Sequence, residues 1–234
     1  MMLARRKRLG LVAVVLVMGA LIGEVRCAEK KGGEAAQVTC GSVIALQGNK
    51  VGTQVACQEV AYGGHGSGQM ACTGVTSVAD LSRYFTVKGV QGEECLQGTP
   101  VTKGMKIRLQ NKATGRWLHS HKFRSMLSKS QEVSCFGGPG ESDDSDVWKV
   151  TWSGGGKFWS NGDKVNLQHD ITGVYLAAMS GQYPQPLTGQ REIAGARTKV
   201  VETFFSAAEG IYFPPRTHQA PESKEGAPKG HSEL

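Results

Sequence analysis

Short stretches in which apolar and polar residues alternate run through the middle of the chain. Residues 107–109 (IRL) and 165–167 (VNL) show this period of two, which is typical of strands with one buried face. A Thr-Gly pair follows each stretch, and glycine supplies the positive φ that a tight hairpin turn requires. The mature part of the chain has no long run of helical periodicity, and residues 78–84 are expected to form one helical turn at most. The pattern therefore predicts an all-β fold built from hairpins.

The alternating stretches belong to a repeated unit. KIRLQNKATGRWL at residues 106–118 matches KVNLQHDITGVYL at residues 164–176, and VIALQGNKVGTQV at residues 43–55 is a fainter copy. Each unit continues with a strand expected to start at a glutamine and closes with an aromatic residue. The glutamines are Gln69, Gln131 and Gln190, and the aromatic residues are Phe85, Trp148 and Phe205. Three units of about 60 residues, with about four short strands each, predict a β-trefoil, whose closed barrel leaves no free sheet edge.

The N-terminal residues have the order of a secretory signal peptide. A basic cluster at residues 5–8 precedes an uncharged apolar run at residues 9–23. That run has 15 residues, fewer than the ~20 that cross a bilayer core. Residues 1–27 are therefore predicted to be a cleaved signal, with an uncleaved anchor as the alternative and no stable membrane span after cleavage.

The C-terminal residues read as an exposed tail with an address. Residues 214–230 are rich in Pro, Lys, Glu and Gly and are expected to be disordered. The last four residues, His231, Ser232, Glu233 and Leu234, are a variant of the signal read by the endoplasmic-reticulum (ER) retention receptor. The chain is thus divided into a signal peptide (1–27), a short linker (28–37), a trefoil (38–213) and a tail (214–234). The three lobes are placed at about 38–95, 96–155 and 156–213, and the location expected is the ER lumen.

Most of the net positive charge lies in the predicted signal peptide. The chain carries a formal charge of +7, which falls to +3 without residues 1–27, because they hold five basic residues and one glutamate. The sequence shows no basic patch with interleaved aromatic residues in what remains, so nucleic acid is not an expected partner.

The cysteines suit an oxidising compartment. Without Cys27, five of the six cysteines remain, so at least one is a free thiol or pairs with a partner. The sequence contains no Cys-x-x-Cys, which leaves a thioredoxin-type site or a zinc knuckle without support. Cys57 and Cys72 are candidates for a disulfide across neighbouring strands of the first lobe, in which case Cys135 is the odd thiol.

His119 and His121 form the most conspicuous chemical motif. Their side chains point to one side of a strand, since side chains alternate along it. A stable zinc site needs three or four ligands, and the best additional donors, in ESDDSD at residues 141–146, are not placed beside the pair by the sequence. A structural or partner-contact role is favoured over metal binding. The acidic run also lacks the pattern of a calcium loop, so a solvated acidic turn is expected there.

A search for catalytic residues gives none. The sequence lacks Gly-x-Ser-x-Gly, and GHGSGQ at residues 64–69, which comes closest, is better explained as a loop. Paired carboxylates remain open, but no spacing nominates them. No enzyme activity, metal or cofactor is predicted.

Several stretches carry a family resemblance. GMKIRLQNKATGRWLHSH, SKSQEVSCFG and DVWKV, in this order, resemble a MIR motif. VTCGSVIAL, YGGHGSGQ, TGVTSV and AAEGIYF extend the likeness over residues 38–213. The whole is similar to the ER-lumenal stromal cell-derived factor 2 family, which implies three MIR repeats in a β-trefoil. Only the second repeat keeps both histidines, so any role that needs the pair in the first repeat is put in doubt.

The resemblance implies a structural disulfide and a function. Cys40 and Cys95 stand where the family has cysteines, and a bridge between them would pin the N-terminal strand. The implied role is a non-enzymatic part of a chaperone and quality-control complex, with a lumenal DnaJ-type co-chaperone, a BiP-type chaperone and unfolded secretory clients as partners. The candidate partner or ligand contact is formed by Arg116, His119, Ser120 and His121. The alternative is a lectin-like binder of mannose or O-mannosylated proteins, which rests on fold analogy.

Overall fold

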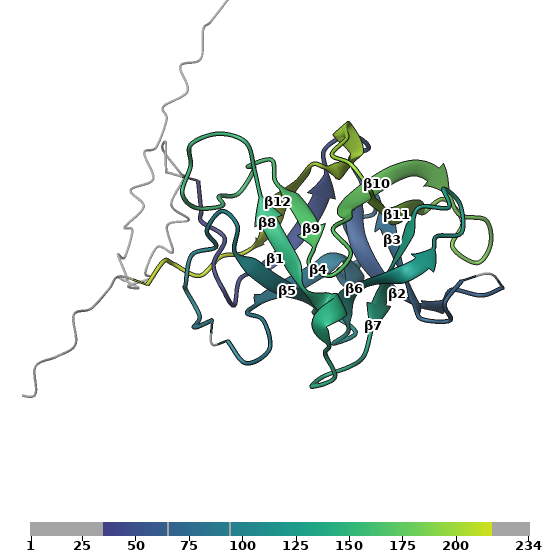
Figure 1. Ribbon diagram of the computed structural model, residues 1–234, viewed down its shortest axis with the longest axis horizontal. Helices are drawn as coiled ribbons and strands as arrows, with labels where there is room; N and C mark the ends of the chain where they lie inside the picture. The colour runs from purple at the N-terminus through teal and green to yellow at the C-terminus, as the bar shows by residue number, and fades with distance from the viewer. Residues whose placement is uncertain (1–34, 65, 94, 217–234) are drawn as a thin grey trace, which may run out of the picture. The chain divides into compact units, whose positions relative to one another are not determined.

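The structure is a computed structural model that describes residues 35–64, 66–93 and 95–216 (Figure 1). The predicted signal peptide, most of the predicted linker and the predicted retention signal lie outside these residues. Within the described ranges, we find no helix with the length and apolar character needed to cross a membrane.

Each of the three lobes contributes four strands. The first lobe holds β1 (Val43–Gly48), β2 (Gln54–Ala61), β3 (Met70–Val75) and β4 (Tyr84–Lys88). The second holds β5 (Lys106–Asn111), β6 (Trp117–Arg124), β7 (Gln131–Phe136) and β8 (Trp148–Thr151). The third holds β9 (Asn166–His169), β10 (Tyr175–Gln182), β11 (Arg191–Ala196) and β12 (Phe205–Ile211). One short 3₁₀ turn precedes the last strand of each lobe: η1 (Leu81–Arg83), η2 (Asp144–Asp146) and η3 (Val201–Thr203).

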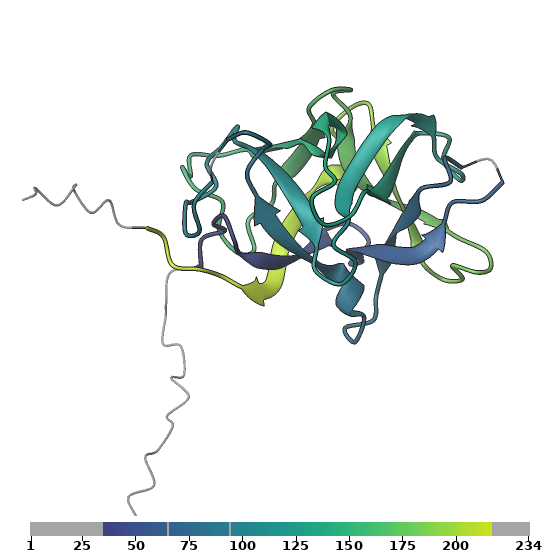
Figure 2. The ribbon, with the colours of Figure 1, turned by 90° about the horizontal axis from the view of Figure 1, so that it is seen from below.

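The first and last strands of the lobes close a barrel. β1 pairs with β4, β4 with β5, β5 with β8 and β8 with β9, all antiparallel. β12 pairs with β1, and a bridge between Val165 and Phe205 joins it to the start of β9. Because every strand of the ring has two neighbours, no barrel edge remains open. The ring with its hairpin cap is the predicted β-trefoil, and Figures 1 and 2 show it from two sides.

The middle strands of the lobes form three hairpins that cap one end of the barrel. β2 pairs with β3, β6 with β7 and β10 with β11. The second strands of these hairpins also pair with one another, β3 with β7, β7 with β11 and β11 with β3. Hairpin residues of one lobe therefore lie directly against those of the next, and the boundaries between lobes are set at this triangle.

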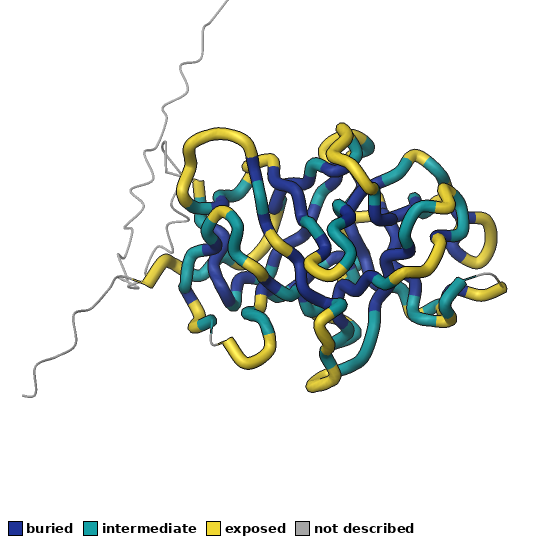
Figure 3. Tube along the Cα trace, in the orientation of Figure 1, coloured by how far each residue is buried: buried dark blue, intermediate teal, exposed yellow. Residues whose placement is uncertain are grey.

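The buried core follows the alternation in the sequence. Ile107 and Leu109 are fully buried, while the residues between and beside them are partly or fully exposed. The closing aromatic residues Phe85, Trp148 and Phe205 have no exposed surface and belong to the same apolar cluster. Figure 3 shows this distribution, with buried segments inside and exposed segments in the outer loops. The repeated apolar positions of the three lobes thus form one shared core.

Two disulfides cross the structure, and one corrects the sequence prediction. Cys40 is bonded to Cys95, as the family resemblance implied. Cys57 is bonded to Cys135 in the second lobe, not to Cys72, so the predicted Cys57–Cys72 bridge is wrong. The prediction considered pairing within one hairpin, where Cys57 and Cys72 are indeed opposite each other. The cap triangle instead brings β7 beside β3, with a Cα–Cα distance of 5.8 Å between Cys57 and Cys135. Cys72, rather than Cys135, is the buried free thiol.

The predicted alignment of the three glutamine-led strands is also off by one residue in the second lobe. Across the hairpins, Met70 lies opposite Ala61, Gln131 opposite Arg124 and Arg191 opposite Gln182. Gln131 is therefore equivalent to the residues that follow Gln69 and Gln190. Gln69 accepts a hydrogen bond from Ser134 in the next lobe, and Gln190 accepts one from Thr73 in the first lobe. Gln131 donates to Thr172 in the third lobe instead.

Candidate functional site

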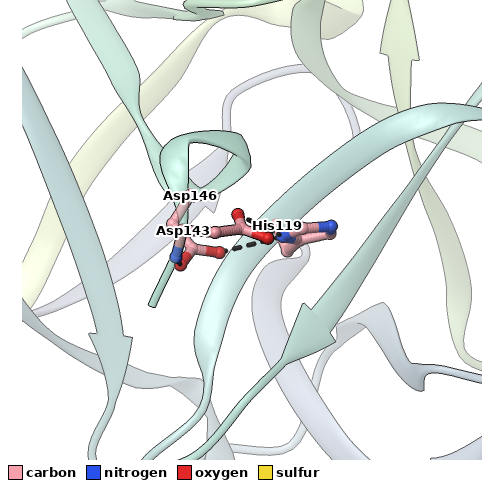
Figure 4. A group of neighbouring side chains, drawn as sticks. All are labelled: His119, Asp143 and Asp146. Carbon is pink, nitrogen blue, oxygen red and sulfur yellow. Dashed lines mark hydrogen bonds and ion pairs between the residues drawn. The ribbon is translucent and has the colours of Figure 1, made fainter. Parts of the chain in front are cut away.

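His119 lies on β6 in a buried polar cluster at the edge of the second lobe. Its side chain is 3% exposed, and its Nδ1 atom lies 2.9 Å from Oδ1 of Asp146. Oδ1 of Asp143 lies 3.6 Å from the same nitrogen. Figure 4 shows both aspartates reaching toward the imidazole from the segment of η2. The proximity of these acids to the histidine could not be predicted, because 24 residues or more separate them along the chain.

Asp146 is a structural carboxylate that closes its own turn. Its Oδ2 atom accepts hydrogen bonds from the Ser142 hydroxyl at 2.8 Å and from the Asp143 backbone amide at 2.9 Å. Together with the bond from Ser145 to the Asp143 side chain, this makes a capping box around η2. Asp146 has no exposed surface, so the prediction of a solvated turn is wrong for this residue.

The same three side chains are the group in the described chain that could hold a metal. One ligand atom each from His119, Asp143 and Asp146 lies within 4.8 Å of the others. Both oxygens of Asp146 already have protein partners, and Asp143 is exposed. The geometry is therefore that of a histidine that anchors an acidic turn to β6.

His121 lies beside Glu132, the residue that joins the second lobe to the first. Its Nε2 atom lies 3.3 Å from Oε1 of Glu132, whose side chain is 1% exposed. The carboxylate of Glu132 also accepts hydrogen bonds from the backbone amide of Ser67, at 3.2 Å, and from the Ser67 hydroxyl. The two histidine rings are 5.2 Å apart, edge to face. The two histidines therefore lie between two polar groups, the Asp146 turn at η2 and the Glu132–Ser67 contact, and are joined to each other by a ring contact.

The predicted contact set separates into buried and accessible residues. Ser120 is fully buried and donates to the carbonyl of Glu132, and His119 is buried with Asp146. Neither of these two residues therefore offers an exposed surface, and their contact with a partner stays a prediction. Arg116 and His121 are partly exposed, and Arg116 donates to the carbonyl of Gly137.

Two buried glutamates that the sequence analysis did not single out join neighbouring lobes. Glu132 holds the loop of the first lobe through Ser67, and Glu192 holds the loop of the second lobe. Glu192 is fully buried and accepts hydrogen bonds from the backbone amides of Leu127 and Ser128. Each glutamate stands directly before a β-branched residue, Val133 or Ile193, in a segment expected to be a buried strand. Because buried carboxylates are almost always paired, a Glu in such a strand indicates a partner from another part of the chain.

His169 is a second buried histidine without a predicted role. Its Nε2 atom lies 2.9 Å from the carbonyl oxygen of Ser145 and therefore donates, while Nδ1 lies 2.8 Å from the hydroxyl of Thr172. Burial lowers the pKa of His169 below its usual value of 6.5, although the bond to Ser145 opposes this shift. The neutral ring bridges η2 to the hairpin turn of the third lobe.

Comparison with known proteins agrees with this architecture. A sequence model of the MIR domain matches residues 52–206, so the protein is a MIR-domain β-trefoil. Stromal cell-derived factor 2-like protein 1 of Bos taurus is 38% identical over 220 residues, which cover 92% of this chain and 95% of the relative. Stromal cell-derived factor 2-like protein of Arabidopsis thaliana is 41% identical over 187 residues, which cover 80% of this chain and 85% of the relative. The crystal structure of the SDF2-like protein from Arabidopsis thaliana superposes with a TM-score of 0.75 at 40% identity, covering 77% of this chain and 99% of that one. The chain belongs to the stromal cell-derived factor 2 family.

Proposed function

We infer that this protein is a non-enzymatic component of a chaperone and quality-control complex for secretory proteins in the ER lumen. Its proposed partners are a DnaJ-type co-chaperone, a BiP-type chaperone and unfolded clients. The observation that carries the proposal is membership of the stromal cell-derived factor 2 family along almost the whole chain. The signal-like N-terminus and the HSEL end are consistent with that compartment.

The geometry supports a binding scaffold. Disulfides tie the first lobe to the chain around it, one at Cys40 and Cys95 and the other at Cys57 and Cys135. The most conspicuous ionisable cluster, at His119 and Asp146, is satisfied by protein groups, so its hydrogen bonds hold loops in place. Loops held on a closed barrel that two disulfides brace are suited to present contacts to partners.

The lectin-like alternative gains little from Trp117, Trp159 and Tyr175, the aromatic side chains that could stack on sugar rings. Trp159 is fully buried. The ring of Trp117 is 5% exposed, and Arg108 stacks on it at 4.6 Å. Lys199 lies 5.3 Å from the ring centre of Tyr175. Stacking on a sugar needs a free ring face; Trp159 and Trp117 are buried, and Tyr175 is the one of the three that is partly exposed.

Affinity capture from an ER lysate tests the proposal. The full chain, tagged after its predicted signal peptide, is expected to recover a DnaJ-type protein and a BiP-type chaperone with or without added mannose. A double substitution of the accessible candidate contact residues, Arg116→Gln with His121→Asn, is expected to reduce that recovery. The matched control, Lys103→Gln with Lys157→Gln, alters two exposed residues elsewhere and should leave recovery unchanged. Complete elution by mannose, with no co-chaperone retained, would reject the proposal in favour of the lectin-like function.

A further inference from the structure

A basic depression lies in the cap where the second lobe meets the third. It has a volume of about 620 Å³. Its walls come from the end of β6, the start of β7, the turn before β10 and the end of β11. The lining residues that matter are Lys122, Phe123, Arg124, Lys129, Gln131 and Arg197. A second, shallower depression shares Lys122, Phe123, Arg124 and Lys129, so these side chains border open space on two sides.

Four cations line this depression, and no carboxylate does. Lys122, Arg124, Lys129 and Arg197 are all exposed, and none forms an ion pair with any residue that the structure describes. Lys129 donates one hydrogen bond to the carbonyl of Met126. Like charges gathered without counter-charges repel one another and create a positive potential that attracts anions.

The fold does not impose these charges. The hairpin registers make Lys122 equivalent to Glu59 and Ser180, and Arg124 equivalent to Ala61 and Gln182. The same registers make Lys129 equivalent to Gly68 and Gly189, and Arg197 equivalent to Gly137 and Thr76. All four positions are therefore basic at the boundary between the second and third lobes, and none of the equivalent residues at the other two boundaries is basic.

The depression at the boundary between the first and second lobes gives a direct comparison. It occupies the equivalent place and has a volume of about 330 Å³. Its lining includes one cation, Arg116, and one carboxylate, Glu141. The scaffold therefore produces a hollow at both boundaries, and the sequence makes only the second one strongly basic.

The backbone conformation at Lys129 is a second, independent indication that the lysine is present for its charge. Its φ angle is 59°, whereas the equivalent glycines, Gly68 and Gly189, have φ angles of 79°. A side chain in this left-handed region carries a cost on the order of 1 kcal/mol that glycine does not. Among the described residues, Lys129 is the one non-glycine residue with a positive φ. Local conformation favours glycine here, and the lysine places a cation at the depression.

We propose that this depression binds an acidic peptide segment, in which carboxylates alternate with apolar side chains. Arg124 and Arg197 supply guanidinium groups that match carboxylates in a bidentate geometry. The exposed ring of Phe123 and the side chain of Val174 supply apolar contact on the same surface. The register of β6 against β7 shifts between Ser120 and Arg124, so Lys122 and Phe123 lie in a bulge at the border of the depression. This proposal stands independently of the chaperone assignment.

Binding of a short fluorescent peptide, with Glu and Asp alternating with Val and Ala, tests the proposal by anisotropy. The full chain is expected to bind it with an affinity that falls steeply with salt, and the same peptide with Gln and Asn in place of the acids should not bind. Arg124→Gln with Arg197→Gln is expected to weaken binding by at least about tenfold, which corresponds to about 1.4 kcal/mol. Lys103→Gln with Lys157→Gln removes the same charge elsewhere and should leave binding within about twofold.

Lys129→Gly keeps the test decisive if the arginine variant does not fold, because glycine suits this backbone. This variant is expected to weaken peptide binding by about threefold with an unchanged or higher melting temperature. The proposal is overturned if the acidic peptide does not bind, or if it binds the arginine variant and Lys129→Gly as well as the unaltered chain. Binding of a sulfated oligosaccharide by the basic depression, with no binding of the acidic peptide, also overturns it and assigns the surface to an anionic glycan.

Discussion

The boundary between the first and second lobes and the boundary between the second and third have the same backbone geometry and different chemistry. At the first, the Cys57–Cys135 disulfide joins the lobes covalently, and Glu132 binds the loop of the first lobe through Ser67. At the second, Glu192 binds two backbone amides of the neighbouring loop, and no disulfide joins these lobes among the described cysteines. The comparison shows that a threefold fold repeats strand positions while each boundary is stabilised in its own way.

The boundary between the third lobe and the first has no buried glutamate and can be compared with the other two. The position equivalent to the two glutamates is Ala71, which packs with Tyr62, Tyr183 and Leu187 in an apolar cluster. An apolar contact thus replaces a buried carboxylate where no loop amide needs an acceptor. The two buried glutamates of the cap, Glu132 and Glu192, both have hydrogen-bond partners, as the cost of leaving a buried carboxylate unpaired requires.

Removal of the disulfide between the first two lobes is expected to have the largest effect on stability. The bond encloses 78 residues, for which the chain-entropy relation gives about 4.5 kcal/mol as an upper value. Cys57→Ala with Cys135→Ala should therefore lower the urea midpoint strongly under oxidising conditions. Cys72→Ala removes a buried thiol without breaking a bond and serves as the matched control. A double variant no less stable than Cys72→Ala would show that the covalent link does not distinguish the two boundaries.

Loss of the buried glutamate at the second boundary should have the next largest effect. Glu192→Ala removes the acceptor from the amides of Leu127, which is partly buried, and Ser128, which is exposed, and should cost about 1–2 kcal/mol in free energy of unfolding. Glu132→Ala frees one backbone amide and one hydroxyl of Ser67, and the cost should be smaller because a hydroxyl can rotate toward another acceptor. Hydrogen exchange should report faster exchange at Leu127 and Ser128 in the first variant. If Glu132→Ala proved less stable than Glu192→Ala, the hydrogen bonds of Glu192 would not be the stronger polar contact between lobes.

A smaller, pH-dependent difference is expected from the hairpin turns of the second and third lobes. His169 in the third lobe is equivalent to Asn111 in the second, so His169→Asn gives one turn the residue of the other. Burial holds the pKa of His169 below 6.5 in the folded chain, and the unfolded chain therefore binds more protons as pH falls through 6.5. The unaltered chain should lose stability relative to His169→Asn as pH falls below that value, toward the lower pKa of the folded state. Parallel stability curves for the two chains between pH 7 and 5 would reject this.

The predictable part of the fold was the part that depends on repetition. The period-two alternation at residues 107–109 and its copy at residues 165–167 identify the barrel strands, because burial of one face imposes that period. The copies also indicate three lobes, and hence the trefoil. The disulfide partner of Cys57 could not be predicted in the same way, because it depends on how β7 packs against β3 in the cap triangle.

The His-x-His spacing of the candidate site could be recognised in the sequence, but the contacts of its side chains could not. The sequence showed that His119 and His121 share one side of a strand, and the rings are neighbours in the structure. It did not show that His119 is buried against Asp146, since contacts between segments far apart in the chain follow from lobe packing. The basic depression was missed for a related reason. The strand from residue 131 was aligned one residue out of register, which hid the equivalence of Lys129 with Gly68 and Gly189.

The smallest expected effect is an exchange of the loop residues at that equivalent position. Lys129→Gly removes a side chain from a left-handed backbone and should raise the free energy of unfolding by up to about 1 kcal/mol. Gly68→Lys introduces the same conflict at the first boundary, where a Cβ atom would meet no other atom within 4 Å, so the cost there is one of backbone conformation alone. Opposite signs in urea unfolding would show that the lysine at the second boundary is held against the preference of its backbone. If Lys129→Gly instead destabilised the chain, the hydrogen bond of Lys129 to Met126 would outweigh the strain, and the lysine would have a structural reason to be there.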